Sequence, residues 1–287
     1  MTEIDENKQK KTLIEIEKAI IKRYRKELWR KFVSAIRDYQ MINDGDTVAV
    51  AISGGKDSLL MAKMFQNLQK YYKIKFKAVY IAMDPGYHPE IRRLLEENCA
   101  YLDIPVNIFE SNIFEAANKI AADYPCYICA KMRRGALYDF AQGLGANKLA
   151  LGHHFNDVIE TTMLNLLYAG CYKSMMPRLR AEHFDNMELI RPMYYIEERD
   201  IIKFMDYSGL TPLNCACMVT SRKTGTKRGE VKKLIAELKK NNQNVDKCIF
   251  KSAENVYLEC ITGWHKNGVK HSFLNEDNSN SGLNKKL

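Results

Sequence analysis

The chain has 287 residues, and 46% of them are hydrophobic, which excludes an intrinsically disordered protein. Its net charge of +9 suits a polyanionic partner without requiring one. Residues 1–11 are charged and polar, unlike a signal peptide, and no uncharged apolar run approaches the length of a membrane span. We therefore expect a cytoplasmic protein with no membrane contact.

The first predicted element is helical, because apolar residues recur at helical spacing from Leu13 to Tyr39. Basic and aromatic residues alternate in the middle of this segment, a pattern that suits RNA phosphates and stacked bases. A solvated helix face above a buried aromatic stripe explains the same pattern. The residues concerned are Lys22, Arg23, Tyr24, Arg25, Lys26, Trp29, Arg30, Lys31 and Phe32.

Strands and helices then alternate along the chain. The pattern predicts strands at 47–52, 76–82, 106–110 and 148–152, and helices from Asp57 onward and at 89–102, 113–122, 132–144 and 157–167. Such alternation indicates an α/β fold, a parallel twisted sheet with helices on both faces. Ligands of such sheets bind beyond the carboxyl ends of the strands. After Tyr207 we expect a cysteine-containing loop, a helix near 230–240 and a fraying end at 275–287.

The loop after the first strand carries the main chemical signal. Its sequence is Ser53-Gly54-Gly55-Lys56-Asp57-Ser58. Two glycines allow the backbone to approach a phosphate, and successive amides followed by a helix N-terminus form an anion-binding nest. The two serines can donate hydrogen bonds, and Lys56 can neutralise charge. Asp57 beside a phosphate calls for a bridging Mg²⁺. An ordinary strand-to-helix turn is the alternative.

The loop lacks the Walker pattern and the dinucleotide pattern G-x-G-x-x-G. Instead, S-G-G-K-D-S resembles the signature of the PP-loop ATP pyrophosphatases. The resemblance implies a PP-loop/HUP-type fold, similar to the adenine nucleotide α-hydrolases. It also implies that ATP is cleaved between its α and β phosphates and that AMP is left on the substrate.

Cysteines form a second signal. Cys126 and Cys129 make a C-x-x-C pair, and Cys215 and Cys217 make a C-x-C pair. In an intracellular chain, a C-x-x-C pair indicates a metal, cluster or redox site more often than a structural accident. A third thiolate from the distant loop would leave one iron of a cluster with an open position, which could hold hydrosulfide. Zinc is the competing metal.

Three segments together resemble the tRNA 2-thiocytidine synthetase (TtcA) family over residues 20–228. They are the phosphate loop, the motif C-x-x-C-(x)3-R-R-G that begins at Cys126, and the motif G-H-H-x-x-D that begins at Gly152. The resemblance implies a 4Fe–4S cluster held by three cysteines and ATP-dependent thiolation of a tRNA cytidine. It also implies the tRNA anticodon loop as substrate, a sulfur donor such as a cysteine desulfurase, and a homodimer.

The third cluster ligand is assigned by spacing within that resemblance. Family members carry a cysteine followed eleven residues later by an arginine, and Cys217 and Arg228 keep this spacing. We therefore expect Cys217, rather than Cys215, to join Cys126 and Cys129 as metal ligand. The chain departs from the C-x-x-C that the family usually shows here, since Met218 stands at the shifted cysteine position.

The second candidate loop also follows a strand. Gly152, His153 and His154 are expected to line the nucleotide pocket, and Asp157 to hold Mg²⁺ or to help activate the substrate. A helix-dipole carboxylate and packed histidines are the structural alternatives. Asn156 stands where the family usually has a second aspartate.

Arg133 and Arg134 follow the cluster cysteines, and arginine side chains suit phosphate groups, either of ATP or of an RNA backbone; plain surface charges are the alternative. Arg133 is expected, with Asp57 and Asp157, to act in catalysis.

The sequence thus predicts three parts: a basic helical segment at 1–45, an ATP-binding domain at 46–210 and a C-terminal extension at 211–287. The predicted reaction is adenylation of a pyrimidine carbonyl, at cytidine C2, followed by replacement of oxygen with sulfur. Another PP-loop amidation or ligation, and a non-catalytic iron–sulfur or nucleotide sensor, are the rival functions.

Overall fold

The computed structural model of the chain describes residues 10–111, 125–213 and 227–276, with only the helical backbone given for 125–131. The predicted N-terminal helical segment is confirmed, although two of its turns are π-helical. Thr12 caps its start, because the Thr12 hydroxyl accepts from the Glu15 amide while the Glu15 carboxylate accepts from the Thr12 amide. The segment comprises α1 (Leu13–Lys18), η1 (Ala19–Arg23), η2 (Arg25–Trp29) and α2 (Arg30–Asp38).

The main sheet of the described residues has the order β3-β2-β1-β4-β6-β5. All of its strand pairs are parallel except the last, in which β5 runs antiparallel to β6. The predicted parallel sheet is therefore confirmed, with an antiparallel edge strand that the sequence pattern did not indicate. The strands are β1 (Thr47–Ala51), β2 (Lys77–Asp84), β3 (Val106–Glu110), β4 (Lys148–Ala150), β5 (Arg178–Arg180) and β6 (Glu188–Ile190).

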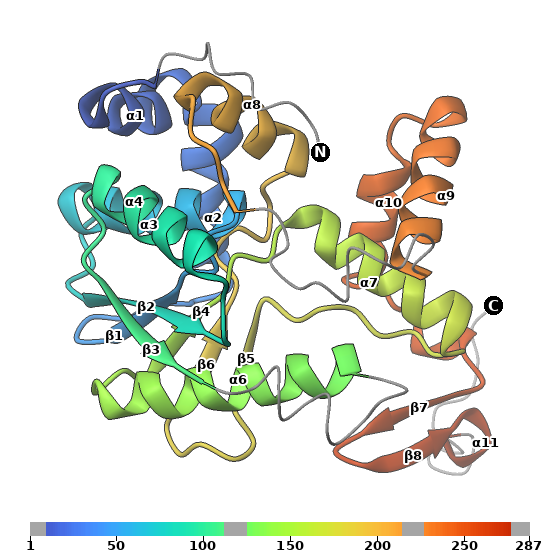
Figure 1. Cartoon of the computed structure of the whole chain (residues 1–287). Helices are drawn as coiled ribbons and strands as arrows, with labels where there is room; N and C mark the ends of the chain where they lie inside the picture. The colour runs from blue at the N-terminus through green and yellow to red at the C-terminus, as the bar shows by residue number, and fades with distance from the viewer. Residues whose placement is uncertain (1–9, 112–124, 214–226, 277–287) are drawn as a thin grey trace. The chain divides into compact units, whose positions relative to one another are not determined.

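Helices cover both faces of this sheet, as Figure 1 shows. One core cluster joins Ala49 and Ala51 of β1 to Tyr138 and Ala141 of α6. Because side chains alternate along a strand, Val48 and Val50 face the opposite side, where α3 contacts β1 and β2. These helices are α3 (Lys56–Tyr71), α4 (Pro89–Tyr101), α6 (Pro125–Gly143), α7 (Phe155–Tyr168) and α8 (Glu198–Ser208).

Several predicted bounds shift in the structure. The helix predicted at 132–144 already begins at Pro125, so Cys126 and Cys129 lie on α6 itself. The helix predicted at 113–122 lies outside the described residues. The helix α8 was not predicted; it ends at Gly209, whose φ of 68° places it in the left-handed region typical of helix ends.

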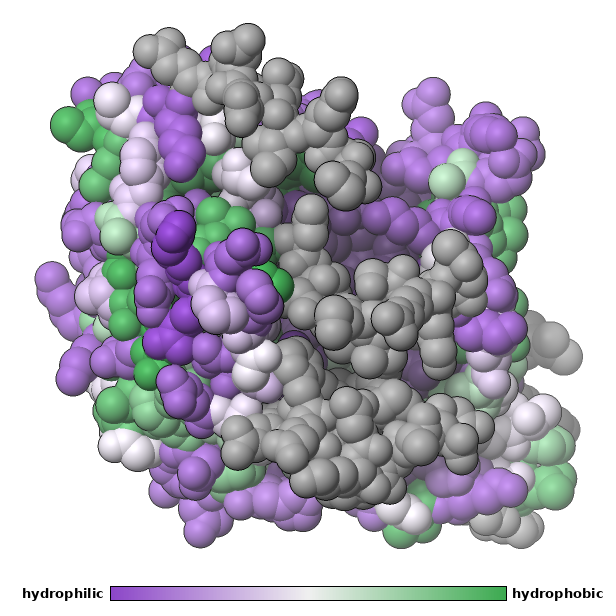
Figure 2. Space-filling model, viewed as in Figure 1, coloured by the Kyte–Doolittle hydropathy of each residue, from purple (hydrophilic) through white to green (hydrophobic). Residues whose placement is uncertain are grey.

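The chain divides into two compact units, residues 1–234 and 235–287. The three-part division made from the sequence stays a prediction. The C-terminal elements are α9 (Lys227–Asn241), α10 (Val245–Ser252), a 3₁₀ turn (Leu258–Cys260), an antiparallel hairpin of β7 (Gly263–Lys266) and β8 (Val269–Ser272), and α11 (Phe273–Glu276). Hydrophilic residues cover α9 and α10 on the face seen in Figure 2. No helix among the described residues is long and apolar enough to cross a membrane.

Candidate functional site

The phosphate loop follows β1 directly and leads into α3. Gly54 has a φ of 78°, a left-handed conformation that favours glycine. A Cβ on Gly54 would lie 2.3 Å from Cδ1 of Leu213. The Leu213 amide donates to the Gly54 carbonyl at 2.9 Å. The chain therefore touches the phosphate loop immediately before it enters residues 214–226, which carry Cys215 and Cys217.

The two serines of the loop brace it internally. The Ser53 amide and hydroxyl both donate to Ser58 Oγ, at 3.1 and 3.2 Å, and the Ser58 hydroxyl donates to the Gly55 carbonyl at 3.0 Å. Ser58 is nearly buried. The Ser58 proton is therefore used within the loop, while the predicted contact of Ser53 and Ser58 with phosphate stays a prediction.

The start of α3 leaves backbone donors open. Its N-cap, Gly55, gives no side-chain cap hydrogen bond, and the described residues provide no acceptor for the amides of Gly54, Lys56 and Asp57. Amides at a helix N-terminus carry partial positive charge and suit an anion. These open amides suit an anion such as a phosphate group, and the predicted binding of ATP phosphates at this loop stays a prediction.

Lys56 is held by carboxylates. Its Nζ lies 3.1 Å from Asp57 Oδ2 and 3.3 Å from Glu198 Oε1. Burial opposes the charge of Lys56, but the two carboxylates outweigh it and raise its pKa. For Glu198, burial is outweighed by Lys232 and Lys56, which hold its pKa below the usual range. Lys56 therefore stays protonated at neutral pH.

The second predicted loop, after β4, lies against the first. A Cβ on Gly152 would lie 3.4 Å from backbone atoms of Asp57 and Ser58, so this loop packs directly against the start of α3. His154 and Asp157 form a reciprocal cap of α7: the His154 amide donates to Asp157 Oδ2 at 2.9 Å, and the Asp157 amide donates to His154 Nδ1 at 3.4 Å.

The two loops meet through His154 and Asp57. Because His154 Nδ1 accepts a hydrogen bond, Nε2 carries the ring proton, and Nε2 lies 3.8 Å from Asp57 Oδ1. Asp57 Oδ1 is buried and has no hydrogen-bond partner among the described residues. A buried carboxylate oxygen without a donor suits a cation, which agrees with the predicted Mg²⁺. Asn156 instead has a structural contact, since its Oδ1 accepts from the Glu198 amide at 2.9 Å.

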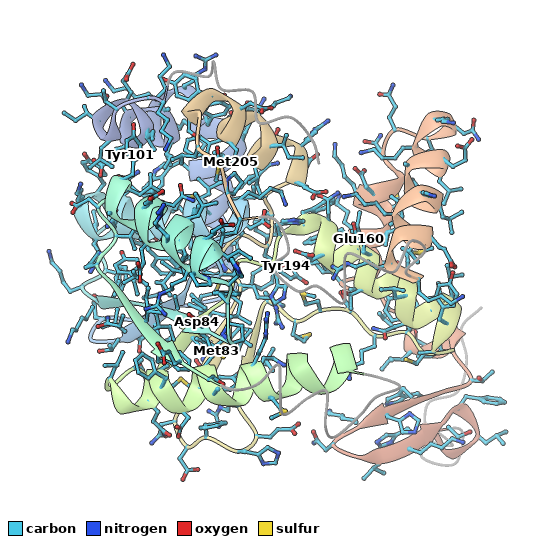
Figure 3. All side chains as sticks on the ribbon, viewed as in Figure 1. Met83, Asp84, Tyr101, Glu160, Tyr194 and Met205 are labelled. Atoms are coloured by element: carbon cyan, nitrogen blue, oxygen red, sulfur yellow. The ribbon has the colours of Figure 1, made fainter. Side chains whose placement is uncertain are left out.

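Asp157 is bound from α9. Arg228 donates to Asp157 Oδ1 at 2.6 Å and to Glu160 Oε2 at 2.7 Å. Glu160 projects from α7 and is buried (Figure 3). Burial of Arg228 is outweighed by Glu160 and Asp157, which raise its pKa. Leu213 and Arg228, which flank residues 214–226 in the sequence, thus both contact the candidate site.

His153 is a neutral histidine. Arg191, which follows β6, donates from Nε to His153 Nδ1 at 3.3 Å. Burial, reinforced by the Arg191 charge, lowers the pKa of His153 to about 4. The remaining proton therefore sits on Nε2, which makes His153 a hydrogen-bond donor at neutral pH.

The structure places Cys126 and Cys129 three residues apart on α6, hence on one face of that helix, and describes no side-chain position for them. Cys217 and Cys215 lie outside the described residues. The donor set, two thiolates one turn apart, suits an iron–sulfur cluster or zinc equally. Arg133 lies one turn after Cys129 and is half-buried.

Sequence reasoning missed four residues at this end of the sheet. Glu198, Glu160 and Arg191 meet the candidate site only in three dimensions, and none belongs to a recognisable motif. Asp84 ends β2 (Figure 3), where its carboxylate accepts from the amides of Gly86 and Tyr87 and from Arg92. Its place after a predicted strand was the one signal available.

A phosphate loop between β1 and α3, faced by a polar loop after β4, defines a nucleotide-binding α/β protein of the PP-loop class. The family model described as "PP-loop domain" matches residues 24–212. A tRNA-cytidine(32) 2-sulfurtransferase of Vibrio parahaemolyticus is 36% identical over 236 residues, covering 80% of this chain and 77% of the relative. The enzyme of that name from Geobacter sulfurreducens is 36% identical over 228 residues, covering 77% and 86%. The chain belongs to this family of PP-loop proteins.

A solved structure agrees on the fold. The U34-tRNA thiolase NcsA from Methanococcus maripaludis, solved with its [4Fe-4S] cluster, superposes with a TM-score of 0.65. The match covers 90% of this chain and 89% of the thiolase, at 22% sequence identity. At that identity the likeness confirms the fold.

Proposed function

We propose that the protein is an ATP-dependent tRNA sulfurtransferase that replaces the C2 oxygen of a cytidine with sulfur. The observation that carries the proposal is the meeting of the two strand-end loops, with His154 Nε2 3.8 Å from Asp57 Oδ1 above open helix amides. The related enzymes named above support the choice of substrate in this proposal, because their name specifies a tRNA cytidine.

The first step is adenylation. The cytidine carbonyl oxygen attacks the α-phosphorus of ATP, the bond between that phosphorus and the bridging oxygen breaks, and pyrophosphate leaves. The open amides of Gly54, Lys56 and Asp57 and the Lys56 charge stabilise the developing negative charge. Asp57 and Asp157 would hold Mg²⁺, which would supply positive charge to stabilise the phosphates during the reaction. Gly152, His153 and His154 line the pocket, and Arg133 adds positive charge.

In the second step sulfide attacks the activated carbon, the carbon–oxygen bond breaks and AMP leaves with the oxygen. AMP is needed because oxide is a poor leaving group. A 4Fe–4S cluster held by Cys126, Cys129 and Cys217 supplies the sulfide chemistry when it is bound.

Topology supports this place for the cysteines. The strand β3 ends at the carboxyl edge of the sheet, and α6 runs back from that side to the start of β4, so the first turns of α6 lie beyond the carboxyl edge. Among the described side chains of α6, the first buried one is Tyr138, nine residues or about 13 Å after Cys129.

The N-terminal helices provide a surface for tRNA. Lys22, Arg25, Lys26 and Arg30 are exposed and have no carboxylate partner among the described residues. The same segment is tied to the site, because Lys31 pairs with Glu197 at 3.2 Å, one residue before Glu198. Exposed cations without a described carboxylate partner, on a segment that contacts the site through Lys31, suit an RNA backbone. The finer partners, a cysteine desulfurase as sulfur donor and a homodimer, and the cytoplasmic location belong to this proposal.

The test is an anaerobic purification followed by iron analysis, absorption spectroscopy and a pyrophosphate-release assay with and without bulk tRNA. We expect cluster absorption and tRNA-stimulated release. Asp57→Asn should reduce release strongly, whereas the matched variant Asp38→Asn should leave it unchanged, because Asp38 pairs only with the exposed Arg37. Zinc without iron would rule out the sulfide step. Release that tRNA does not stimulate would favour a small-molecule PP-loop reaction, and no release would favour a sensor.

A further inference from the structure

One buried arginine beside the site forms no ion pair with any residue that the structure describes. Arg191 is 6% exposed and follows β6 at the carboxyl edge of the sheet. Its hydrogen-bond acceptors are neutral: Nε donates to His153 Nδ1 and Nη1 donates to the Met176 carbonyl. No carboxylate within the described ranges lies at ion-pair distance from Arg191.

Three other arginines are ion-paired. Arg178 binds Glu188, Arg92 binds Asp84 and Arg228 binds Asp157, each within 3 Å. Charged side chains are seldom buried without a counter-charge, because removing them from water costs several kcal/mol. The isolation of Arg191 therefore requires an explanation that internal packing does not supply.

A second arginine increases this local positive charge. Arg134 lies on α6, one turn before Tyr138, and is exposed. Burial, reinforced by the charge of Arg134, lowers the pKa of Arg191 to about 10. Burial raises the pKa of Tyr138, and the charges of Arg191 and, less strongly, of Arg134 oppose that rise, so both guanidinium groups act on the same side chain. Arg134 has no ion pair in the part of the chain that the structure describes.

The third member is His153. Its Nδ1 is occupied by Arg191, so its Nε2–H is a donor, and burial keeps the ring neutral at physiological pH. Arg191 after β6 and His153 after β4 are thus in contact, and Arg134 lies on α6 one turn before Tyr138; neither arginine has an ion pair among the described residues. Guanidinium groups bind phosphate oxygens with paired, charge-assisted hydrogen bonds.

We propose that Arg191, Arg134 and His153 form a phosphate-binding subsite next to the phosphate loop. The assignment rests on the proposed function and extends it, since the nest at α3 accounts for only part of the negative charge of the reactants. Two sources supply the same chemistry: the pyrophosphate that ATP releases, and a phosphodiester of the RNA that flanks the modified base.

Binding measurements on the full chain separate these sources. The probes are inorganic pyrophosphate with Mg²⁺, followed by calorimetry, and a tRNA transcript, followed at several salt concentrations. The variants are Arg134→Gln, which removes an exposed charge, and Arg191→Lys, which keeps the charge but loses the planar fork. Arg93→Gln is the control, because Arg93 is an exposed arginine of α4 that pairs only with Glu97.

We expect Arg134→Gln to weaken one probe about tenfold, as the loss of a charge-assisted contact does. Loss of pyrophosphate affinity alone assigns the subsite to the ATP reactant. Loss of tRNA affinity assigns the subsite to the RNA backbone if the slope of log K against log salt concentration also falls by about one, as the loss of one phosphate contact requires. Arg191→Lys should follow Arg134→Gln on the same probe.

The proposal is overturned if Arg134→Gln binds both probes within twofold of the Arg93→Gln control. It is also overturned if Arg191→Lys lowers the melting temperature while Arg134→Gln leaves both affinities intact, because Arg191 would then be purely structural. Pyrophosphate release from ATP, measured on the same wild-type preparation, tests the proposed function separately. If the wild-type protein releases no pyrophosphate but Arg134→Gln still weakens binding of a probe, the proposed function is refuted and the subsite is retained.

Discussion

The contact of Arg228 with α7 should hold the start of α9 against Asp157 and Glu160. Arg228→Ala removes hydrogen bonds of 2.6 Å to Asp157 and 2.7 Å to Glu160. Hydrogen bonds between charged groups contribute about 1.5–3 kcal/mol each when they are protected from water. The Arg228 side chain is 45% exposed, so solvent screening reduces this value, whereas Glu160 is only 8% exposed and loses its one cation. We expect a loss of about 2 kcal/mol.

A double-mutant cycle isolates this interaction. Unfolding free energies are measured by urea denaturation for the wild type, Arg228→Ala, Glu160→Gln and the double variant. The expected coupling energy is about 1–2 kcal/mol. Amide hydrogen exchange at the start of α9 should quicken about 30-fold in Arg228→Ala, as an opening favoured by 2 kcal/mol requires. Arg199→Ala is the control, since Arg199 makes an exposed pair with Glu197 and should couple by less than about 1 kcal/mol.

Additive effects in the Arg228–Glu160 cycle would refute this reasoning. So would exchange at the start of α9 that stays at the wild-type rate, because the guanidinium contacts would then not hold this helix end. If the coupling is present, thiolation by Arg228→Ala should fall more than its ATP-dependent pyrophosphate release, since the phosphate loop itself is untouched.

Three further predictions concern the loops and the cysteines. Gly54→Ala should destabilise the protein by more than Gly145→Ala. Both positions have a left-handed φ, which costs about 1 kcal/mol for alanine, but only a Cβ at Gly54 would meet a close neighbour, at 2.3 Å. Thermal unfolding of the two variants measures the difference. His153→Gln should reduce the loss of stability at acidic pH. A histidine whose folded pKa is about 4 instead of 6.5 contributes stability above pH 6.5 that is lost towards pH 4. The unfolding free energies of the wild type and the variant, measured with urea, should therefore change differently between pH 6.5 and pH 4. Cys126→Ala should abolish cluster absorption and Cys248→Ala should not, since Cys248 is an exposed cysteine of α10; equal loss in both would refute the ligand choice.

The nucleotide loops were predictable because their signals are local. The strand β1 is a short run that is apolar after Thr47, and the left-handed turn at Gly54 needs a glycine, so residue types alone mark both. Likewise His154 and Asp157 stand three apart at the start of a helix, which is the spacing of a reciprocal cap.

The missing elements have weaker local signals. The strands β5 and β6 have three residues each, and β5 reads Arg-Leu-Arg, so hydrophobic periodicity cannot detect them. They form because β4 offers an unpaired edge once the fold is assembled. In contrast, α8 was detectable: Ile201, Phe204 and Met205 are buried at helical spacing, and Gly209 marks the end.

The site residues that sequence reasoning missed act through space. Glu198 reaches Lys56 from a helix more than 140 positions later in the chain, and Arg191 reaches His153 from a neighbouring strand end. An isolated charged residue in a sequence gives no indication of its partner, so only the assembled sheet shows which of them meet.

The two contacts that flank residues 214–226 have a consequence for how the length of this segment can change. Leu213 contacts Gly54 through a backbone hydrogen bond and Arg228 contacts Asp157 through an ion pair, so both flanks are attached to the same candidate site. Because the entropy lost on joining two fixed points rises only slowly with the number of residues between them, an insertion between Leu213 and Arg228 should cost little stability as long as both contacts are kept.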